Sequence, residues 1–195
     1  LRPSAPRPGT GRWSGARDPY PAGLPNKDLT ICSQLKIDGP TADNSVYNKK
    51  LLIQGTMERY NTGGFKSGAG AGATISFAGT SAQTIGGALG DFTGTNAFNN
   101  FEINNIAGLR VNDAGAIEVS GNLLLTSGLI NTSGTRRLTI TNSSVNCVVP
   151  SGGSATSFID GPLYKRISQY DNFLYPIGVF IPGPGNILGN NIKIS

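Results

Sequence analysis

Short apolar stretches, each broken by Gly, Ser, Thr or Asn, recur along most of this chain and constrain its fold more than any other feature. Within a stretch the apolar residues alternate with other residues, as at Leu123 and Leu125 and again at Leu138 and Ile140. Alternation with a period of two predicts β-strands that bury one face and expose the other. No 3.6-residue periodicity extends over a window long enough for a helix.

The stretches also recur at a longer interval. Ile103 and Leu125 are 22 residues apart, and Val119 and Ile140 are 21 residues apart. A period in the low twenties with several short strands per unit is typical of a β-solenoid, in which each coil adds one layer. We therefore predict an all-β chain folded as a right-handed parallel β-helix (a β-solenoid), with aliphatic side chains stacked in columns.

An antiparallel β-sandwich is the competing architecture, because it also consists of short strands and turns. Its hairpin dipeptide Asn-Gly does not occur, and Asp-Gly occurs at residues 38–39 and 160–161. The chain has 28 Gly among its 195 residues, and charged residues make up only 14%. This composition suits many short strands and tight turns, because Gly and Asn tolerate positive φ angles.

Three regions are expected: an extended Pro/Gly/Arg-rich tail at 1–27, the solenoid at 28–157, and a strand or hairpin end segment at 158–195. Aromatic residues and Pro-Gly pairs cluster in the last region. The open ends of a solenoid carry unpaired backbone groups and favour pairing with another chain. We expect the contacts between copies to involve Trp13 and Tyr20 in the tail and Ile192 and Ile194 at the other end.

The net charge of +5 resides mostly in the tail. Residues 1–27 hold five basic residues and one acidic residue, so the remaining residues contribute only +1. A nucleic-acid-binding domain normally carries a basic face on its folded part, so nucleic acid is not expected as a partner. No apolar run reaches the length of a membrane span, and no signal peptide is recognisable at the N-terminus.

Catalysis is not expected, and we predict no catalytic residue, cofactor or metal. The sequence contains no His, which removes the common nucleophile–imidazole triads and imidazole zinc sites. Paired carboxylates remain conceivable, but Glu102 and Glu118 lie between inward residues and are expected to be solvated surface charges. Neither the Gly-rich loop at 61–72 nor the segment at 86–94 matches a phosphate-binding or calcium-binding motif.

Two further features leave alternatives open. Cys32 and Cys147 match no metal spacing, and they are either buried free thiols or a disulfide. Several Asn residues are expected to point outward, and they serve either in turns or in a side-chain ladder along one corner. These residues are Asn104, Asn105, Asn122, Asn131 and Asn142.

Residues 96–178 resemble a repeat found in large secreted and cell-surface proteins of Bacteroidetes-type bacteria. The resemblance lies in "NAFNNFEINNIAGLRVNDAGAIEVSGNLLLTSGLINTSGTRRLTIT", followed by "GGSATSFIDGPLYKR" and "FLYPIG". It implies a parallel β-helical stalk, export to the cell surface, and a role in adhesion or extracellular structure. The tail, the region before residue 90 and the final "NIKIS" depart from the pattern.

The sequence thus predicts a non-enzymatic extracellular protein, either an adhesin stalk or a filament subunit. Its partners would be other copies of itself, stacked head to tail, with the tail bridging to a neighbour. Because that contact does not close on itself, it would yield fibres. The alternative is a polysaccharide-binding or carbohydrate-active module in which Tyr164, Tyr170 and Tyr175 contact surface glycans.

Overall fold

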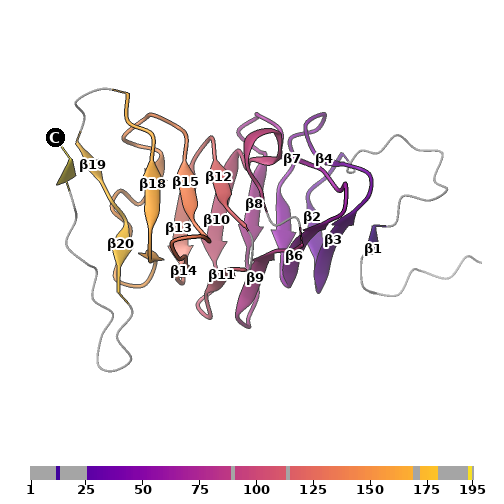
Figure 1. Cartoon of the computed structure of the whole chain (residues 1–195), viewed down its shortest axis with the longest axis horizontal. Helices are drawn as coiled ribbons and strands as arrows, with labels where there is room; N and C mark the ends of the chain where they lie inside the picture. Colours follow the sequence, from indigo (N-terminus) through magenta and orange to yellow (C-terminus); the bar gives the residue numbers. More distant parts are fainter. Residues whose placement is uncertain are drawn as a thin grey trace, which may run out of the picture.

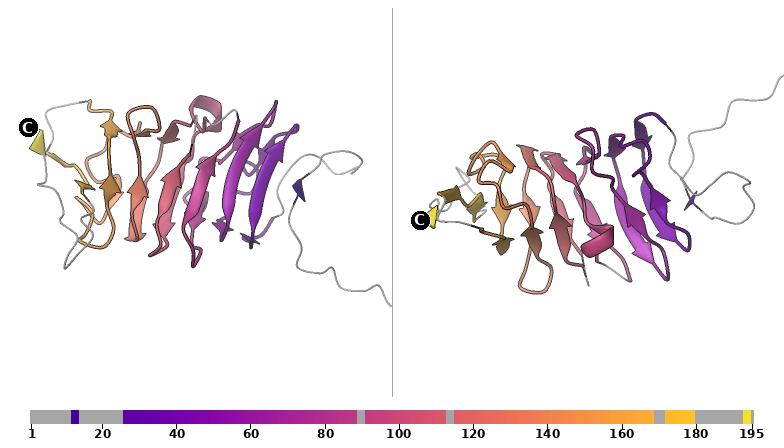
Figure 2. Two further views of the ribbon diagram at one scale, coloured as in Figure 1. Left: turned by 60° about the horizontal axis from the view of Figure 1, so that its bottom comes forward. Right: turned by 90° about the horizontal axis from the view of Figure 1, so that it is seen from above.

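The structure, a computed structural model, describes residues 12–13, 26–88, 91–112, 115–168, 172–179 and 193–194. These residues form a stack of parallel strands with about six turns and no α-helix (Figure 1). Each turn of the chain crosses the same faces in the same order, so strands far apart in sequence lie side by side along the long axis (Figure 2). The predicted β-solenoid is confirmed.

The largest face is an eight-stranded sheet, in which β1 and then every turn in sequence contribute one strand. Its strands are β1 (Arg12–Trp13), β3 (Gln34–Asp38), β6 (Thr56–Tyr60), β9 (Gln83–Gly86), β11 (Leu109–Val111), β14 (Ile130–Asn131), β17 (Ile159–Asp160) and β20 (Ile177–Gly178).

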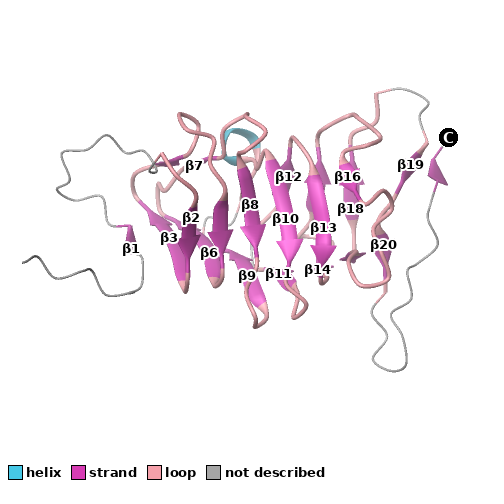
Figure 3. Ribbon diagram, turned by 180° about the vertical axis from the view of Figure 1, so that it is seen from behind, coloured by secondary structure: helices cyan, strands magenta, loops and turns pink. Residues whose placement is uncertain are grey.

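A six-stranded sheet forms the second face and is seen best from behind (Figure 3). Its strands are β2 (Leu29–Ile31), β5 (Leu51–Ile53), β8 (Thr74–Phe77), β10 (Asn100–Asn104), β13 (Leu123–Ser127) and β16 (Val148–Val149).

The third face is made of two parallel sheets with a short irregular stretch between them. β4 (Ala42–Asp43) pairs with β7 (Phe65–Lys66), and a three-stranded sheet joins β12 (Ile117–Val119), β15 (Leu138–Ile140) and β18 (Leu163–Lys165). The stretch between them holds the short 3₁₀ helix η1 (Gly94–Asn96). On either side of η1, Phe92 and Phe98 form single bridges to β12, which keeps this turn in the stack.

The strand register confirms the columns expected from the sequence. Ile103 is paired with Leu125, and Val119 is paired with Ile140. The first column continues through Phe77 to Ile53, and these side chains are buried inside the stack. Each fully buried side chain of this size stabilises the fold by about 1.5–3 kcal/mol, so the columns supply most of the driving force.

A cluster of phenylalanine rings fills the core where the third face is irregular. Phe98 lies at the centre of the cluster, with ring centroids 5.5 Å from Phe65, 5.0 Å from Phe92 and 5.1 Å from Phe101. All four rings are fully buried. Large rings fill the core here, where the third face has no regular strand of its own among the described residues.

The five asparagines do not form a ladder with one another among the described residues. Asn105 lies buried in a corner, where its Nδ2 donates to Gln83 Oε1 at 2.9 Å and its Oδ1 accepts from the Ala107 amide at 2.9 Å. Asn142 donates to the Gly121 carbonyl, Asn131 donates to Asp160, and Asn104 accepts from Ser127. Asn122 is exposed. Turn chemistry and bonds between coils therefore explain the other four, and the expectation that Asn105 points outward is wrong.

Both ends of the stack include short strands from the terminal regions. In the eight-stranded sheet Trp13 is paired in parallel with Ile37 of β3. At the other end β19 (Phe173–Leu174) pairs antiparallel with β21 (Lys193–Ile194), which places Ile194 opposite Phe173. The expected boundary between residues 157 and 158 falls inside the parallel stack, which continues through β17, β18 and β20.

The two cysteines are free thiols. Cys32 is exposed in the turn between β2 and β3, and Cys147 is buried just before β16. The chain crosses several turns between them, which explains why they cannot reach each other.

Candidate functional site

The outer face of the six-stranded sheet carries a row of polar side chains that extends along the long axis. We call the set Asp28, Lys50, Ser76, Glu102, Asn104, Thr126 and Ser127 the polar row. Glu102 lies on β10 between the buried side chains of Phe101 and Ile103, so alternation directs it to the outer face, as predicted. In register it lies beside Ser76 of β8 and Leu124 of β13.

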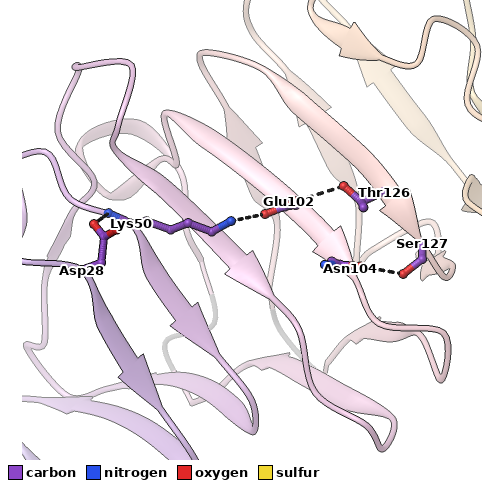
Figure 4. Close-up of polar contacts among 6 residues, drawn as sticks. All are labelled: Asp28, Lys50, Glu102, Asn104, Thr126 and Ser127. Atoms are coloured by element: carbon purple, nitrogen blue, oxygen red, sulfur yellow. Dashed lines mark hydrogen bonds and ion pairs between the residues drawn. The ribbon is translucent and has the colours of Figure 1, made fainter.

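Glu102 is the centre of the polar row (Figure 4). Its Oε2 accepts a hydrogen bond from Lys50 Nζ at 2.7 Å, although Lys50 belongs to the second turn and Glu102 to the fourth. On the other side its Oε1 accepts from Thr126 Oγ1 at 2.9 Å. The Lys50 side chain therefore spans two turns of the stack, over the outer face of β8.

The surroundings of Glu102 change its acidity. Its side chain is only 12% exposed, so the expectation of a solvated surface charge is wrong for this residue. Burial raises the pKa of Glu102, but hydrogen bonds from Lys50 and Thr126 and the adjacent Ser76 hydroxyl outweigh it and hold the pKa below its ordinary value. The Ser76 hydroxyl faces the carboxylate but forms no hydrogen bond of standard geometry.

Two further contacts extend the polar row in both directions. Asp28 Oδ1 accepts from the Lys50 amide at 3.0 Å, and Ser127 Oγ donates to Asn104 Oδ1 at 2.9 Å (Figure 4). Each contact joins one turn to another. The polar row therefore fixes neighbouring turns in register. Both oxygens of the Glu102 carboxylate accept hydrogen bonds from the chain itself.

Other acidic residues of the repeat region also accept hydrogen bonds from the backbone of the chain. Asp91 Oδ1 accepts from the Ala116 amide at 2.9 Å, and Glu118 Oε2 accepts from the Gly94 amide at 2.7 Å. Asp113 lies outside the described residues. No group of three or more His, Cys, Asp or Glu side chains able to hold a metal ion occurs within the part of the chain that the structure describes.

One buried charged residue was not singled out from the sequence. Arg59 on β6 points into the stack, where its Nε donates to the Gly63 carbonyl at 2.8 Å and its Nη1 donates to the Asp91 carbonyl. Its guanidinium lies 5.7 Å from the centre of the Phe92 ring. Burial lowers the pKa of Arg59, and the charge of Asp91 partly opposes this. Arg59 is two residues after the inward Met57 on the same strand, so the alternation of the sequence already predicts that Arg59 points inward.

The three tyrosines proposed as glycan contacts have different environments. Tyr164 on β18 points outward and is 48% exposed, with the Arg137 guanidinium 5.4 Å from the centre of its ring. Tyr175 packs against the core and meets Phe173 edge to face at 4.9 Å, and burial raises its pKa. Tyr170 lies outside the described residues. Tyr164 and Tyr175 therefore do not share one exposed surface.

The proposed subunit contacts are described only in part. Trp13 and Ile194 are placed by backbone pairing within their own chain, to β3 and β19 respectively. Tyr20 and Ile192 lie outside the described residues.

The geometry defines the protein as a β-solenoid whose polar outer contacts connect successive turns. Comparison with protein-family models, with curated proteins and with solved structures gave no match. The resemblance to bacterial surface repeats therefore stays a prediction from the sequence. In the described ranges no helix has the length and apolar character needed to cross a membrane.

Proposed function

We propose that the protein is a non-enzymatic structural module of the cell surface or extracellular space. It acts as an adhesin stalk or as a subunit of a self-assembling filament. The observation that carries this proposal is the open stack: the six-stranded sheet ends at β2 on one side and at β16 on the other, with no further described strand beside either. Unpaired edges of this kind accept a strand from another chain. The cell-surface location rests on the sequence resemblance alone.

Stacking would be head to tail. A contact that continues the parallel stack would place the β16 edge of one copy beside the β2 edge of the next.

The tail would join copies by pairing its strand β1 with β3 of a neighbouring copy instead of with β3 of its own chain. The parallel pairing of Arg12 and Trp13 with β3 is made within one chain. The identical pairing between two chains would be a strand exchange, which costs little because no new contact is needed. We also infer a right-handed coil, because connections between parallel strands of one sheet are right-handed in almost all proteins.

The absence of enzymatic activity is part of the proposal. It is supported by the lack of His in the sequence and by the contacts of Asp91, Glu102 and Glu118, which bind backbone or side-chain groups of the chain itself.

The test uses the edge of β2. The Leu29 amide donates to the Lys50 carbonyl, and the Ile31 carbonyl accepts from the Gln54 amide, so alternation in a parallel ladder directs the backbone of Thr30 away from β5. Thr30→Pro removes the outward N–H group, whereas Thr30→Val keeps it. We expect fibres from the wild type and from Thr30→Val by negative-stain electron microscopy, and folded monomers from Thr30→Pro. Wild-type protein that stays monomeric at high concentration would contradict the proposal.

A further inference from the structure

The outer face of the three-stranded sheet carries an exposed aromatic ring between two exposed arginines. Tyr164 lies on β18 beside Thr139 of β15 in register, and the Arg166 amide donates to the Ile140 carbonyl, which places Arg166 beside Thr141. Arg137 precedes β15, and its guanidinium lies over the Tyr164 ring. We call Arg137, Thr139, Tyr164 and Arg166 the Tyr164 surface.

The part of the chain that carries this surface has an excess of positive charge. Residues 131–168, all of them described, contain four basic residues and one acidic residue. The acidic residue, Asp160, lies on the eight-stranded sheet, where it accepts a hydrogen bond from Asn131. Its charge is therefore on another face. Glu118 of β12 lies beside Thr139 in the same outward column, and its Oε2 accepts from the Gly94 amide.

Two of the four cations are available to a ligand. Lys165 is engaged, because its Nζ donates to the carbonyls of Asn142 and Arg166 and lies 5.1 Å from the centre of the Phe173 ring. Arg136 has contacts of its own. Arg137 and Arg166 are both exposed, and they lie on opposite sides of Tyr164 along the strand direction. Four residue steps at about 3.3 Å each separate their backbone positions by roughly 13 Å along that direction.

The chemistry of these groups defines the ligand. An aromatic ring that is half exposed stacks on the apolar face of a sugar ring, and a guanidinium binds a carboxylate through two parallel hydrogen bonds. Because the two arginines extend from backbone positions four residue steps apart on one sheet face, they match charges repeated along a polymer better than a single small anion. We propose that the Tyr164 surface binds a carboxylated polysaccharide.

This proposal goes beyond the structural role and does not depend on it. The four residues belong to two neighbouring turns of one chain, so a monomer contains the whole site. A stalk or filament with this site would display one polysaccharide contact per copy. Nucleic acid is the other class of polyanion, but single strands bind to a basic groove with several aromatic rings, whereas the Tyr164 surface has one ring and two arginines.

The experiment is native gel electrophoresis of the protein in gels that contain either polygalacturonate or neutral dextran, at several concentrations of each polymer. We expect retardation of the wild type by polygalacturonate alone, and weaker retardation at high salt because salt screens exposed charges. Tyr164→Ala and Arg166→Ala should each raise the apparent dissociation constant by about tenfold. Arg137→Lys should retain part of the binding, because lysine keeps the charge but not the planar fork.

The controls change the same residue types elsewhere. Tyr47 is 43% exposed in the turn between β4 and β5, and Arg110 is exposed on β11. Tyr47→Ala and Arg110→Ala should bind like the wild type, and circular dichroism should show all variants folded. Equal retardation in both polymers would overturn the proposal. Equal losses for Tyr164→Ala and Tyr47→Ala would also overturn it, and so would tighter binding of single-stranded DNA than of polygalacturonate.

Discussion

Glu102 illustrates how a single residue connects several turns of the stack. Its carboxylate contacts Lys50 from two turns earlier and Thr126 from the next turn. The Lys50 end of the contact is 42% exposed, so its contribution is reduced by solvent. The contact mainly specifies how the turns are aligned, because it favours one register of the turns over a shifted one.

The first prediction concerns Glu102 and pH. Its folded-state pKa is lowered from an ordinary value of 4.5, so the charged form favours the folded state. The stabilisation is fully present above the ordinary value and is lost as the pH falls through the lowered value. We expect Glu102→Gln to cost about 1 kcal/mol at neutral pH and to flatten the loss of stability in acid. Urea unfolding at a series of pH values measures both effects.

The matched control is Ser127→Ala, which removes a hydrogen bond between uncharged groups on the same sheet. Ser127→Ala should lower the free energy of unfolding by an amount that does not change with pH. If the Glu102→Gln curve runs parallel to the wild-type curve down to about pH 3, the assigned role of the carboxylate is wrong.

Much of the residue-level detail follows from parity along the strands. Leu123 and Leu125 face inward because they occupy alternate positions, and Thr126 faces outward for the same reason. The contact between Lys50 and Glu102 could not be predicted in this way, because it depends on the reach of a long side chain across a strand between them. The same holds for the Arg137–Tyr164 contact, which needs the register of two strands from different turns.

At the scale of elements, the corners between sheets depend on backbone conformations that few residues adopt. Gly128 follows β13 with φ of +87°, and a Cβ atom there would overlap the carbonyl oxygen of Asn105 in the preceding turn. The close approach and the positive φ both require glycine. Gly134, in the loop between β14 and β15, has neither restriction.

The second prediction uses this contrast. Gly128→Ala should lower the free energy of unfolding by more than about 2 kcal/mol, because the backbone of two turns must move apart. Gly134→Ala should be neutral, or stabilising by about 0.5 kcal/mol through the unfolded state. Thermal and urea unfolding of the pair give the comparison, and equal effects would show that the corner is not closely packed.

The corners also explain why hairpin signals in the sequence do not form hairpins. Asp38 and Asp160 end β3 and β17, and the glycines that follow have φ of +107° and +128°. The chain therefore turns a corner into the next face of the solenoid instead of folding back on the same strand. Positive φ at glycine serves both kinds of turn, so the dipeptide alone cannot separate them.

On the scale of the whole molecule, the stack behaves as a one-dimensional array in which each turn contacts mainly its neighbours. The sequence predicted this architecture because the period of 21–22 residues appears in both the apolar columns and the strand register. The pairings of β1 and β21 could not be predicted, since each involves two residues without a repeated pattern. The continuation past residue 157 was obscured by the aromatic composition of that region.

The third prediction follows from the array. Amide hydrogen exchange should be slowest in β8 and β10, which have turns on both sides, and faster in β2 and β16, which lie at the ends of the six-stranded sheet. Exchange followed by mass spectrometry at neutral pH measures the gradient. Uniform protection from end to end would instead indicate a single cooperative unit.

The direction of the hydrogen bonds has a mechanical consequence. They join successive turns along the long axis, slanted to the strands as in other parallel sheets, so tension applied to the two ends would load the outermost turn before the others. A turn of 22 residues that peels away would extend to roughly 75 Å before the next turn is loaded. A stack built in this way would yield in steps and absorb a pull gradually instead of breaking at one point.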